Sequence, residues 1–129
     1  MSNWRETASA YIQQHEGFKN HVYKCSEGYP TAGWGHKLTA DELKRFPMGT
    51  EVPKDQILAW WNKDLGQYLA YADSLANQHG GAYTKPNVRT VMADMSFQMG
   101  EAGVNKFVKM HQAIRANDLA TAAREMLDS

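Results

Sequence analysis

The sequence predicts an α+β fold that is mostly helical, with one small antiparallel sheet near the N-terminus. Apolar residues recur at helical spacing over most of the chain. Two short β-prone runs, residues 18–24 and 31–35, are separated by the turn sequence SEGYP. With 129 residues, 43% of them hydrophobic, the chain suits a single domain, residues 1–129. We expect a sheet lobe at about 17–52, a bridging helix at about 53–79, and a helical lobe at about 82–129 that includes the N-terminal helix.

The first helix is expected to run from a cap at Ser2 or Asn3 to a stop at Gly17. Its apolar face takes Trp4, Ala8, Tyr11 and Ile12. Glu16 then lies at the C-terminal end, where a carboxylate opposes the helix macrodipole. A locally unfavourable residue at this position points to function.

Capping signals define the next two helices. Thr39 and Glu42 form a capping box for a short helix that ends before Pro47. Pro53 suits the first turn of a long helix that continues to His79, where Gly80-Gly81 stops it. This is the helix expected to bridge the two lobes.

The second half of the chain predicts helices only. Apolar spacing supports a helix through residues 88–99, which halts at Gly100 and resumes near Val104. A last amphipathic helix follows a cap at Asn117 and reaches Leu127.

Composition excludes several function classes. The 14 Lys and Arg residues balance 14 Asp and Glu residues, so no basic field favours nucleic acid. The N-terminus lacks the apolar core of a signal peptide, and no run approaches the roughly 20 residues that span a bilayer, so we expect no membrane insertion. The single cysteine allows no internal disulfide. The five histidines show no metal-ligand spacing, so neither a metal nor a cofactor is expected.

Residues 16–36 hold a glutamate, a cysteine and a threonine around a glycine-rich hairpin. Glycoside hydrolysis needs an acid at the leaving oxygen and a base or nucleophile on the other face of the sugar. Glu16 suits the acid if apolar neighbours raise its pKa, and Phe18, Tyr23 and Trp34 adjoin it in the sequence.

Cys25 has several interpretations. An ordinary thiol is mostly protonated at neutral pH and is a poor base. Cys25 could attack the sugar as a thiolate, help position an attacking water, or simply pack as a small apolar residue. The Thr31 hydroxyl can hydrogen-bond a water, although a β-branched residue in a strand needs no special explanation.

The segment EGFKNHVYKCSEGYPTAGWGH resembles the phage-type lysozymes, glycoside hydrolase family 24. In that family a Glu ends the first helix, an Asp or sometimes a Cys lies in the hairpin, and a Thr follows on the next strand. The resemblance implies a lysozyme-like fold and the catalytic residues Glu16, Cys25 and Thr31. It also implies a structural ion pair of His36 with Asp64, and a substrate-binding role for Gln98 in SFQMGEAGVNKF. Trp34 and Gly35, inside the motif, are further candidates for substrate binding.

The activity that this resemblance implies is that of a muramidase. It would cut the β-1,4 bond between N-acetylmuramic acid and N-acetylglucosamine in bacterial peptidoglycan and lyse the host cell. Such a protein is made in the host cytoplasm and depends on a holin to reach the wall. We expect a monomer if the chain is complete.

The chain departs from the family pattern in two places. Cys25 replaces the commoner Asp, which leaves a retaining or an inverting outcome open. The chain stops after Glu125-Met126-Leu127-Asp128-Ser129, where the family continues with Arg-Trp and basic helices. A short C-terminus would uncover part of the helical lobe and allow association there.

Three other functions remain open. The same site could act as a lytic transglycosylase that forms an anhydro sugar with Glu16 alone. A degenerate lysozyme could bind peptidoglycan without turnover. A helical interaction protein unrelated to glycans would make the spacing of Glu16, Cys25 and Thr31 a coincidence.

Overall fold

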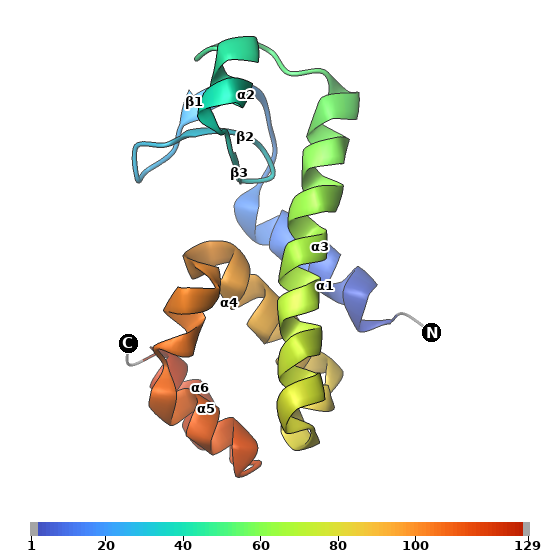
Figure 1. Ribbon diagram of the computed structural model, residues 1–129, viewed down its shortest axis with the longest axis vertical. Coiled ribbons are helices and arrows are strands. Elements are labelled where there is room, and N and C mark those ends of the chain that lie inside the picture. The colour runs from blue at the N-terminus through green and yellow to red at the C-terminus, as the bar shows by residue number, and fades with distance from the viewer. Residues whose placement is uncertain (1–2, 128–129) are drawn as a thin grey trace. The chain divides into compact units, whose positions relative to one another are not determined.

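The computed structural model describes residues 3–127 and confirms the expected α+β fold, which combines helices with one small antiparallel sheet (Figure 1). The elements in chain order are α1 (Trp4–Glu16), β1 (Lys19–Lys24), β2 (Pro30–Gly33), β3 (His36–Lys37), α2 (Ala40–Arg45), α3 (Lys54–His79), the 3₁₀ helix η1 (Gly81–Thr84), α4 (Pro86–Asn105), α5 (Val108–Arg115) and α6 (Leu119–Leu127). Within the described range, no helix combines the length and apolar character needed to cross a bilayer.

The described chain divides into two compact units. Residues 11–66 form the first, which we call the sheet unit. The residues up to Ala10 and those from Gln67 onward form the second, which we call the helical unit. The dividing points fall inside α1 and α3, so each of these helices contributes to both units.

Helix α1 begins and ends where the sequence predicts. The Asn3 Oδ1 accepts a hydrogen bond from the backbone N–H of Glu6 at 3.0 Å, so Asn3 is a cap. Gly17 ends the helix with a φ of +68°, which favours glycine, and its N–H donates to the Gln13 carbonyl. The prediction for Tyr11 was wrong: its ring is 42% exposed and lies edge-on to His15. The helical period places this ring at the margin of the apolar face.

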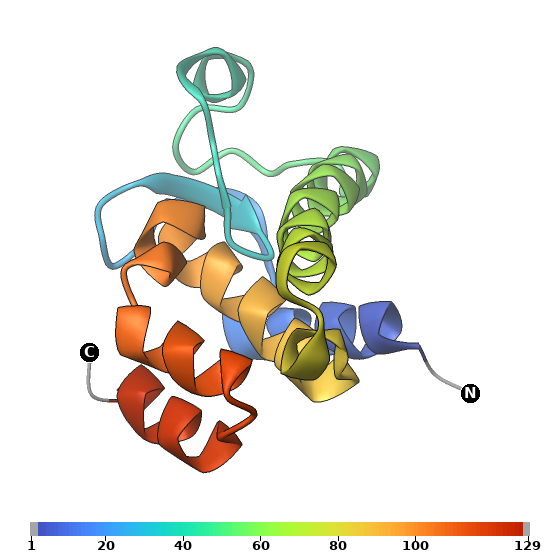
Figure 2. The ribbon, with the colours of Figure 1, turned by 60° about the horizontal axis from the view of Figure 1, so that its bottom comes forward.

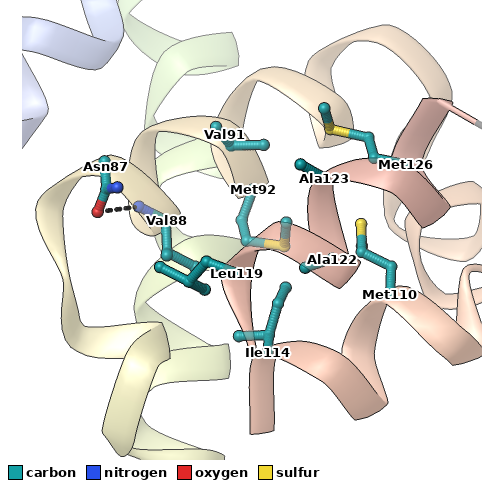
Figure 3. Close-up of a pocket in the computed structure, with 10 residues that line it drawn as sticks. All are labelled: Asn87, Val88, Val91, Met92, Met110, Ile114, Leu119, Ala122, Ala123 and Met126. Atoms are coloured by element: carbon teal, nitrogen blue, oxygen red, sulfur yellow. Dashed lines mark hydrogen bonds between the residues drawn. The ribbon is translucent and has the colours of Figure 1, made fainter. Parts of the chain in front are cut away.

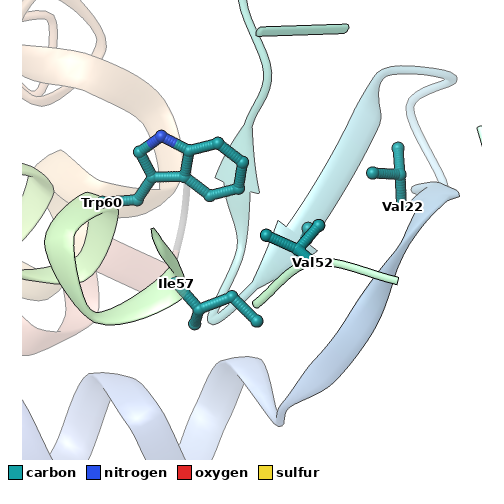
Figure 4. Close-up of a cluster of buried hydrophobic side chains, with 5 residues drawn as sticks. Val22, Val52, Ile57 and Trp60 are labelled. Carbon is teal, nitrogen blue, oxygen red and sulfur yellow. The ribbon is translucent and has the colours of Figure 1, made fainter. Parts of the chain in front are cut away.

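The sheet has the order β1-β2-β3, with both neighbouring pairs antiparallel. Strand β3 was not predicted, because two residues are too few to show an alternating pattern. A compact apolar cluster underlies the sheet and includes Val22, Val52, Ile57 and Trp60 (Figure 4). Gly33 has a φ of +67°, and a Cβ at this position would lie 2.9 Å from Ile57 Cγ2. The close approach of β2 to α3 therefore requires glycine.

Helix α2 has the predicted capping box. The Thr39 hydroxyl accepts from the Glu42 backbone N–H, and the Glu42 carboxylate accepts from the Thr39 N–H at 2.9 Å. None of the six residues of α2 is fully buried. The helix therefore depends on its cap and on side-chain links to its neighbours.

In the helical unit, α4 is interrupted at Gly100, whose φ of +76° is not helical. Helices α5 and α6 pack side by side (Figure 2). The cap predicted for the last helix at Asn117 was wrong, because Asn117 takes a φ of +58° and ends α5 instead. Asp118 caps α6, since its Oδ1 accepts from the Thr121 N–H at 3.1 Å. Asn and Asp have similar cap preferences, so the sequence did not separate the two neighbours.

An apolar cavity of about 190 Å³ lies between α4, α5 and α6 (Figure 3). Met92, Met110 and Ile114 line its buried side, and Leu119, Ala123 and Met126 of α6 line it as well. Met92 and Met110 are almost completely buried, so the cavity reaches the core of the helical unit.

His111 is a buried polar residue of the same unit. Its Nε2–H donates to the Val104 carbonyl at 3.1 Å, so Nδ1 accepts from the hydroxyl of buried Tyr83. Burial lowers the pKa of His111, and the charges of Arg115 and His79 lower it further, against the opposing hydrogen bond to Val104. His111 is therefore held as a neutral ring.

Candidate active site

Glu16, Cys25 and Thr31 all belong to the sheet unit. Glu16 is the last residue of α1 and is half-buried. Gly17 turns the chain there, and β1 begins at Lys19. A helix end followed at once by a strand thus positions this carboxylate.

A tight turn between β1 and β2 positions Cys25. The N–H of Cys25 donates to the Tyr29 carbonyl at 3.0 Å, and the Gly28 N–H donates back to the Cys25 carbonyl at 2.8 Å. Gly28 has a φ of +90°, which explains why glycine occurs in this turn. The half-buried thiol therefore lies at the base of the hairpin tip.

The surroundings of Cys25 favour its thiolate. Its pKa is lowered first by the Tyr29 backbone N–H, then by the Thr31 hydroxyl and the Glu27 backbone N–H, all of which hydrogen-bond the sulfur. Partial burial and the Glu27 carboxylate oppose the shift without cancelling it. The direction of this shift opposes the high pKa of an ordinary thiol, which is the main objection to Cys25 from its sequence alone.

Thr31 is buried in β2, opposite Tyr23 of β1. Its Oγ1 lies 2.8 Å from the Tyr29 carbonyl and also interacts with the Cys25 sulfur. A hydroxyl has one proton to donate, so it serves either the carbonyl or the thiolate at a given moment. The structure thus brings Cys25 and Thr31 together.

Tyr23 links Glu16 to this pair. Its pKa is raised mainly by burial, and further by the negative charges of Cys25 and Glu16. The charges of Glu16 and Cys25 therefore both disfavour ionisation of the Tyr23 phenol in the hairpin. Phe18, also expected to shield Glu16, is 48% exposed and lies against Trp34, with ring centroids 4.9 Å apart. Its ring is therefore not part of a closed apolar pocket.

The proposed substrate-binding residues lie in different units. Trp34 is half-buried in the sheet unit, with its ring centroid 5.6 Å from that of Trp61, and Gly35 follows it with a φ of +74°. Gln98 is exposed on α4 of the helical unit, where its amide donates to the Asp94 carboxylate at 3.3 Å. Trp60 and Trp61 are buried, as expected for core residues.

His36 is held between two carboxylates. Its Nδ1 lies 2.7 Å from Asp64 Oδ2, which is the pair expected from the family resemblance, and its Nε2 lies 2.9 Å from Glu42 Oε1. The ring also stacks on Trp60, with centroids 4.3 Å apart and planes at 16°. The contact of Glu42 with His36 was not predicted, because the capping box already explained a glutamate at this position. The additional signal available was a histidine six residues before an acidic residue.

Metal chemistry finds no support in the side-chain arrangement. Across residues 3–127, no group of three or more His, Cys, Asp or Glu side chains could hold an ion. The chemistry considered below uses only protein groups and water.

A comparison with protein-family models decides the family. The model described as phage lysozyme matches residues 13–128, which is most of the chain. The chain belongs to the phage lysozyme family. No curated protein matches the chain significantly. Membership in the phage lysozyme family places the chain among glycoside hydrolases that degrade peptidoglycan. The matched region contains Glu16, Cys25 and Thr31.

Proposed function

We propose that the chain is a muramidase that cleaves the β-1,4 bond between N-acetylmuramic acid and N-acetylglucosamine and thereby lyses bacterial host cells. The observation that carries this proposal is the arrangement of two ionisable groups around Tyr23. One is a carboxyl at a helix end, and the other is a thiol whose pKa is lowered by three hydrogen bonds. Such an acid and base pair is what glycoside hydrolysis requires.

In this proposal Glu16 is the general acid. It donates its proton to the glycosidic oxygen as the bond to the anomeric carbon breaks, and the sugar develops oxocarbenium character. The Cys25 thiolate stabilises the opposite face and Thr31 orients the group that attacks there. Substrate binding is assigned to Trp34, Gly35 and Gln98.

The stereochemistry of the product separates two roles for Cys25. Direct attack by the thiolate, followed by hydrolysis of the thioglycoside, retains the anomeric configuration. Attack by a water that the thiolate activates inverts it. NMR of the freshly formed reducing end identifies the anomer before it equilibrates.

The test of the assignment is the substitution Glu16→Gln, which keeps the size of the side chain and removes its proton. We expect release of reducing ends from purified peptidoglycan to fall at least about 100-fold, the usual contribution of a general acid. Glu51→Gln is the control, since Glu51 is an exposed glutamate of the same unit. Full activity in Glu16→Gln would overturn the assignment. Binding of peptidoglycan by the parent without release of sugar would instead identify a module that has lost turnover.

Two properties of the cellular context belong to the same proposal. The protein is synthesised in the host cytoplasm, and a holin gives it access to the cell wall. Both rest on the resemblance to phage-type lysozymes.

A further inference from the structure

The contacts of His36 define its protonation state. Both ring nitrogens face carboxylate oxygens, Asp64 on one side and Glu42 on the other. An ionised carboxylate only accepts hydrogen bonds, and a neutral imidazole has a single N–H. Both hydrogen bonds can therefore form together only when the ring is an imidazolium.

Glu42 connects this ring to the cap of α2. Its Oε1 accepts from His36 Nε2 and also from the Thr39 backbone N–H, each at 2.9 Å. The same carboxylate oxygen thus closes the capping box and links α2 to β3. Asp64 lies on α3, so the protonated ring connects three elements: β3, α2 and α3.

Few other contacts hold α2. None of its residues is fully buried, although Leu43 and the following Phe46 pack partly against the apolar cluster below. One other side-chain link to α3 is the hydrogen bond from Arg45 Nη2 to Gln56 Oε1, at 3.0 Å. This second link joins a guanidinium to an uncharged amide.

We propose that His36 is a pH-sensitive link between α2 and α3. Its protonated ring connects the two helices through Glu42 and Asp64, and loss of that proton releases α2 while the rest of the sheet unit stays folded.

The electrostatics set the direction of the switch. Burial of the His36 ring opposes its protonation, but the hydrogen bonds and charges of Asp64 and Glu42 together outweigh it, and the pKa is raised above 6.5. The pKa of Glu42 is lowered, since hydrogen bonds from Thr39 and His36 outweigh the effect of its burial. Glu42 therefore stays ionised throughout, and His36 is the group that titrates. The link is complete below pH 6.5 and is lost as the pH rises through the raised pKa.

The groups that face His36 from each neighbouring element agree with this direction. Helix α2 presents Glu42, and α3 presents Asp64 and the Trp60 ring. Strand β2 presents Ala32, which pairs with His36 and carries no charge. The neighbouring pair joins Thr31 to Lys37, so β3 stays paired with β2 when α2 is released.

Amide hydrogen exchange, followed by NMR over a series of pH values and corrected for intrinsic rates, tests the proposal. In the parent we expect protection of the α2 amides to fall at least about tenfold as the pH passes the His36 pKa, the size of effect that one pKa unit represents. The midpoint should coincide with the titration of the His36 ring protons in the same spectra. The amides that bond across β1 and β2 should keep their protection.

Two variants distinguish a pH-sensitive link from a merely structural contact. Glu42→Gln should abolish the pH step and lower the pKa of His36. Arg45→Gln, which removes the hydrogen bond to Gln56, should lower α2 protection at every pH and leave the step in place. Protection of α2 that does not change with pH in the parent would overturn the proposal. A pH step in the parent whose midpoint differs from that of the His36 titration would also overturn the proposal. This measurement uses the parent alone, so it remains decisive even if Glu42→Gln fails to fold.

Discussion

At the scale of single residues, the hydroxyl of Thr31 helps to lower the pKa of Cys25. It is one of three groups that lower the pKa of the thiol, and it is the only side chain among them. We predict that Thr31→Val, which keeps the volume of a buried side chain, raises the pKa of Cys25 and lowers activity at neutral pH. The ultraviolet absorbance of the thiolate, followed during a pH titration, measures this shift.

The same substitution should have little effect on stability. The Tyr29 carbonyl that loses the Thr31 hydroxyl still accepts the Cys25 N–H at 3.0 Å, so no buried acceptor is left unpaired. Thr50→Val, at a half-buried threonine of the same unit, is the matched control. An unchanged thiol pKa in Thr31→Val would show that the hydroxyl serves only the Tyr29 carbonyl.

The sequence could indicate Glu16, Cys25 and Thr31 because their spacing along the chain is itself the signal. Its only sign of Glu42 as a partner of His36 is a histidine six residues before an acidic residue, since the contact depends on how α2 folds over β3. The sequence could not indicate the pair of Tyr83 and His111, which are 28 positions apart and carry no motif. Contacts between residues far apart in the sequence can be predicted only once the fold is known, whereas caps and turns depend on neighbouring residues.

At the scale of elements, local signals predicted where α1, α2 and α3 end, because caps and glycine stops act within a few residues. Strand β3 pairs with β2 across a turn of a few residues, but it was missed because its two residues are too few to show an alternating pattern. Packing of helices is not local, and no pattern in the sequence indicated the cavity between α4, α5 and α6.

That cavity leads to a prediction for α6. Ala123 lines the cavity, so Ala123→Leu should place apolar atoms in it and raise the free energy of unfolding by about 0.5 to 2 kcal/mol. Ala120→Leu is the control, because Ala120 is an exposed alanine of the same helix that does not line the cavity. Denaturant titration measures both. Equal effects of the two substitutions would mean that helix propensity, and not cavity filling, is responsible.

At the scale of the whole molecule, the two units respond to pH in opposite directions. His36 of the sheet unit has a raised pKa, so its contribution is complete below pH 6.5 and is lost as the pH rises through that pKa. His111 of the helical unit has a lowered pKa, so its contribution is complete above pH 6.5 and is lost as the pH falls toward that pKa. Stability should therefore be greatest between the two transitions.

We predict that His111→Gln reduces the loss of stability at acid pH and leaves the loss of stability at alkaline pH unchanged. At neutral pH it should also destabilise the chain by about 1 to 3 kcal/mol, because the flexible Gln amide does not reproduce the fixed placement of the two imidazole nitrogens between the Tyr83 hydroxyl and the Val104 carbonyl. Denaturant unfolding at several pH values measures both effects. His21→Gln, at an exposed histidine of β1, should change neither side. An acid transition that persists in His111→Gln would assign it to other groups.

Cys25 is the one cysteine in the chain, and it lies in the hairpin beside Thr31. A carboxylate at this position would be inert toward soft electrophiles, whereas a thiolate reacts with alkyl halides and maleimides. One reagent added to the intact protein therefore forms a bond at one sulfur. By the role proposed for Cys25, this reaction inactivates the protein, and it also attaches a spectroscopic label within the proposed site with no engineered residue required.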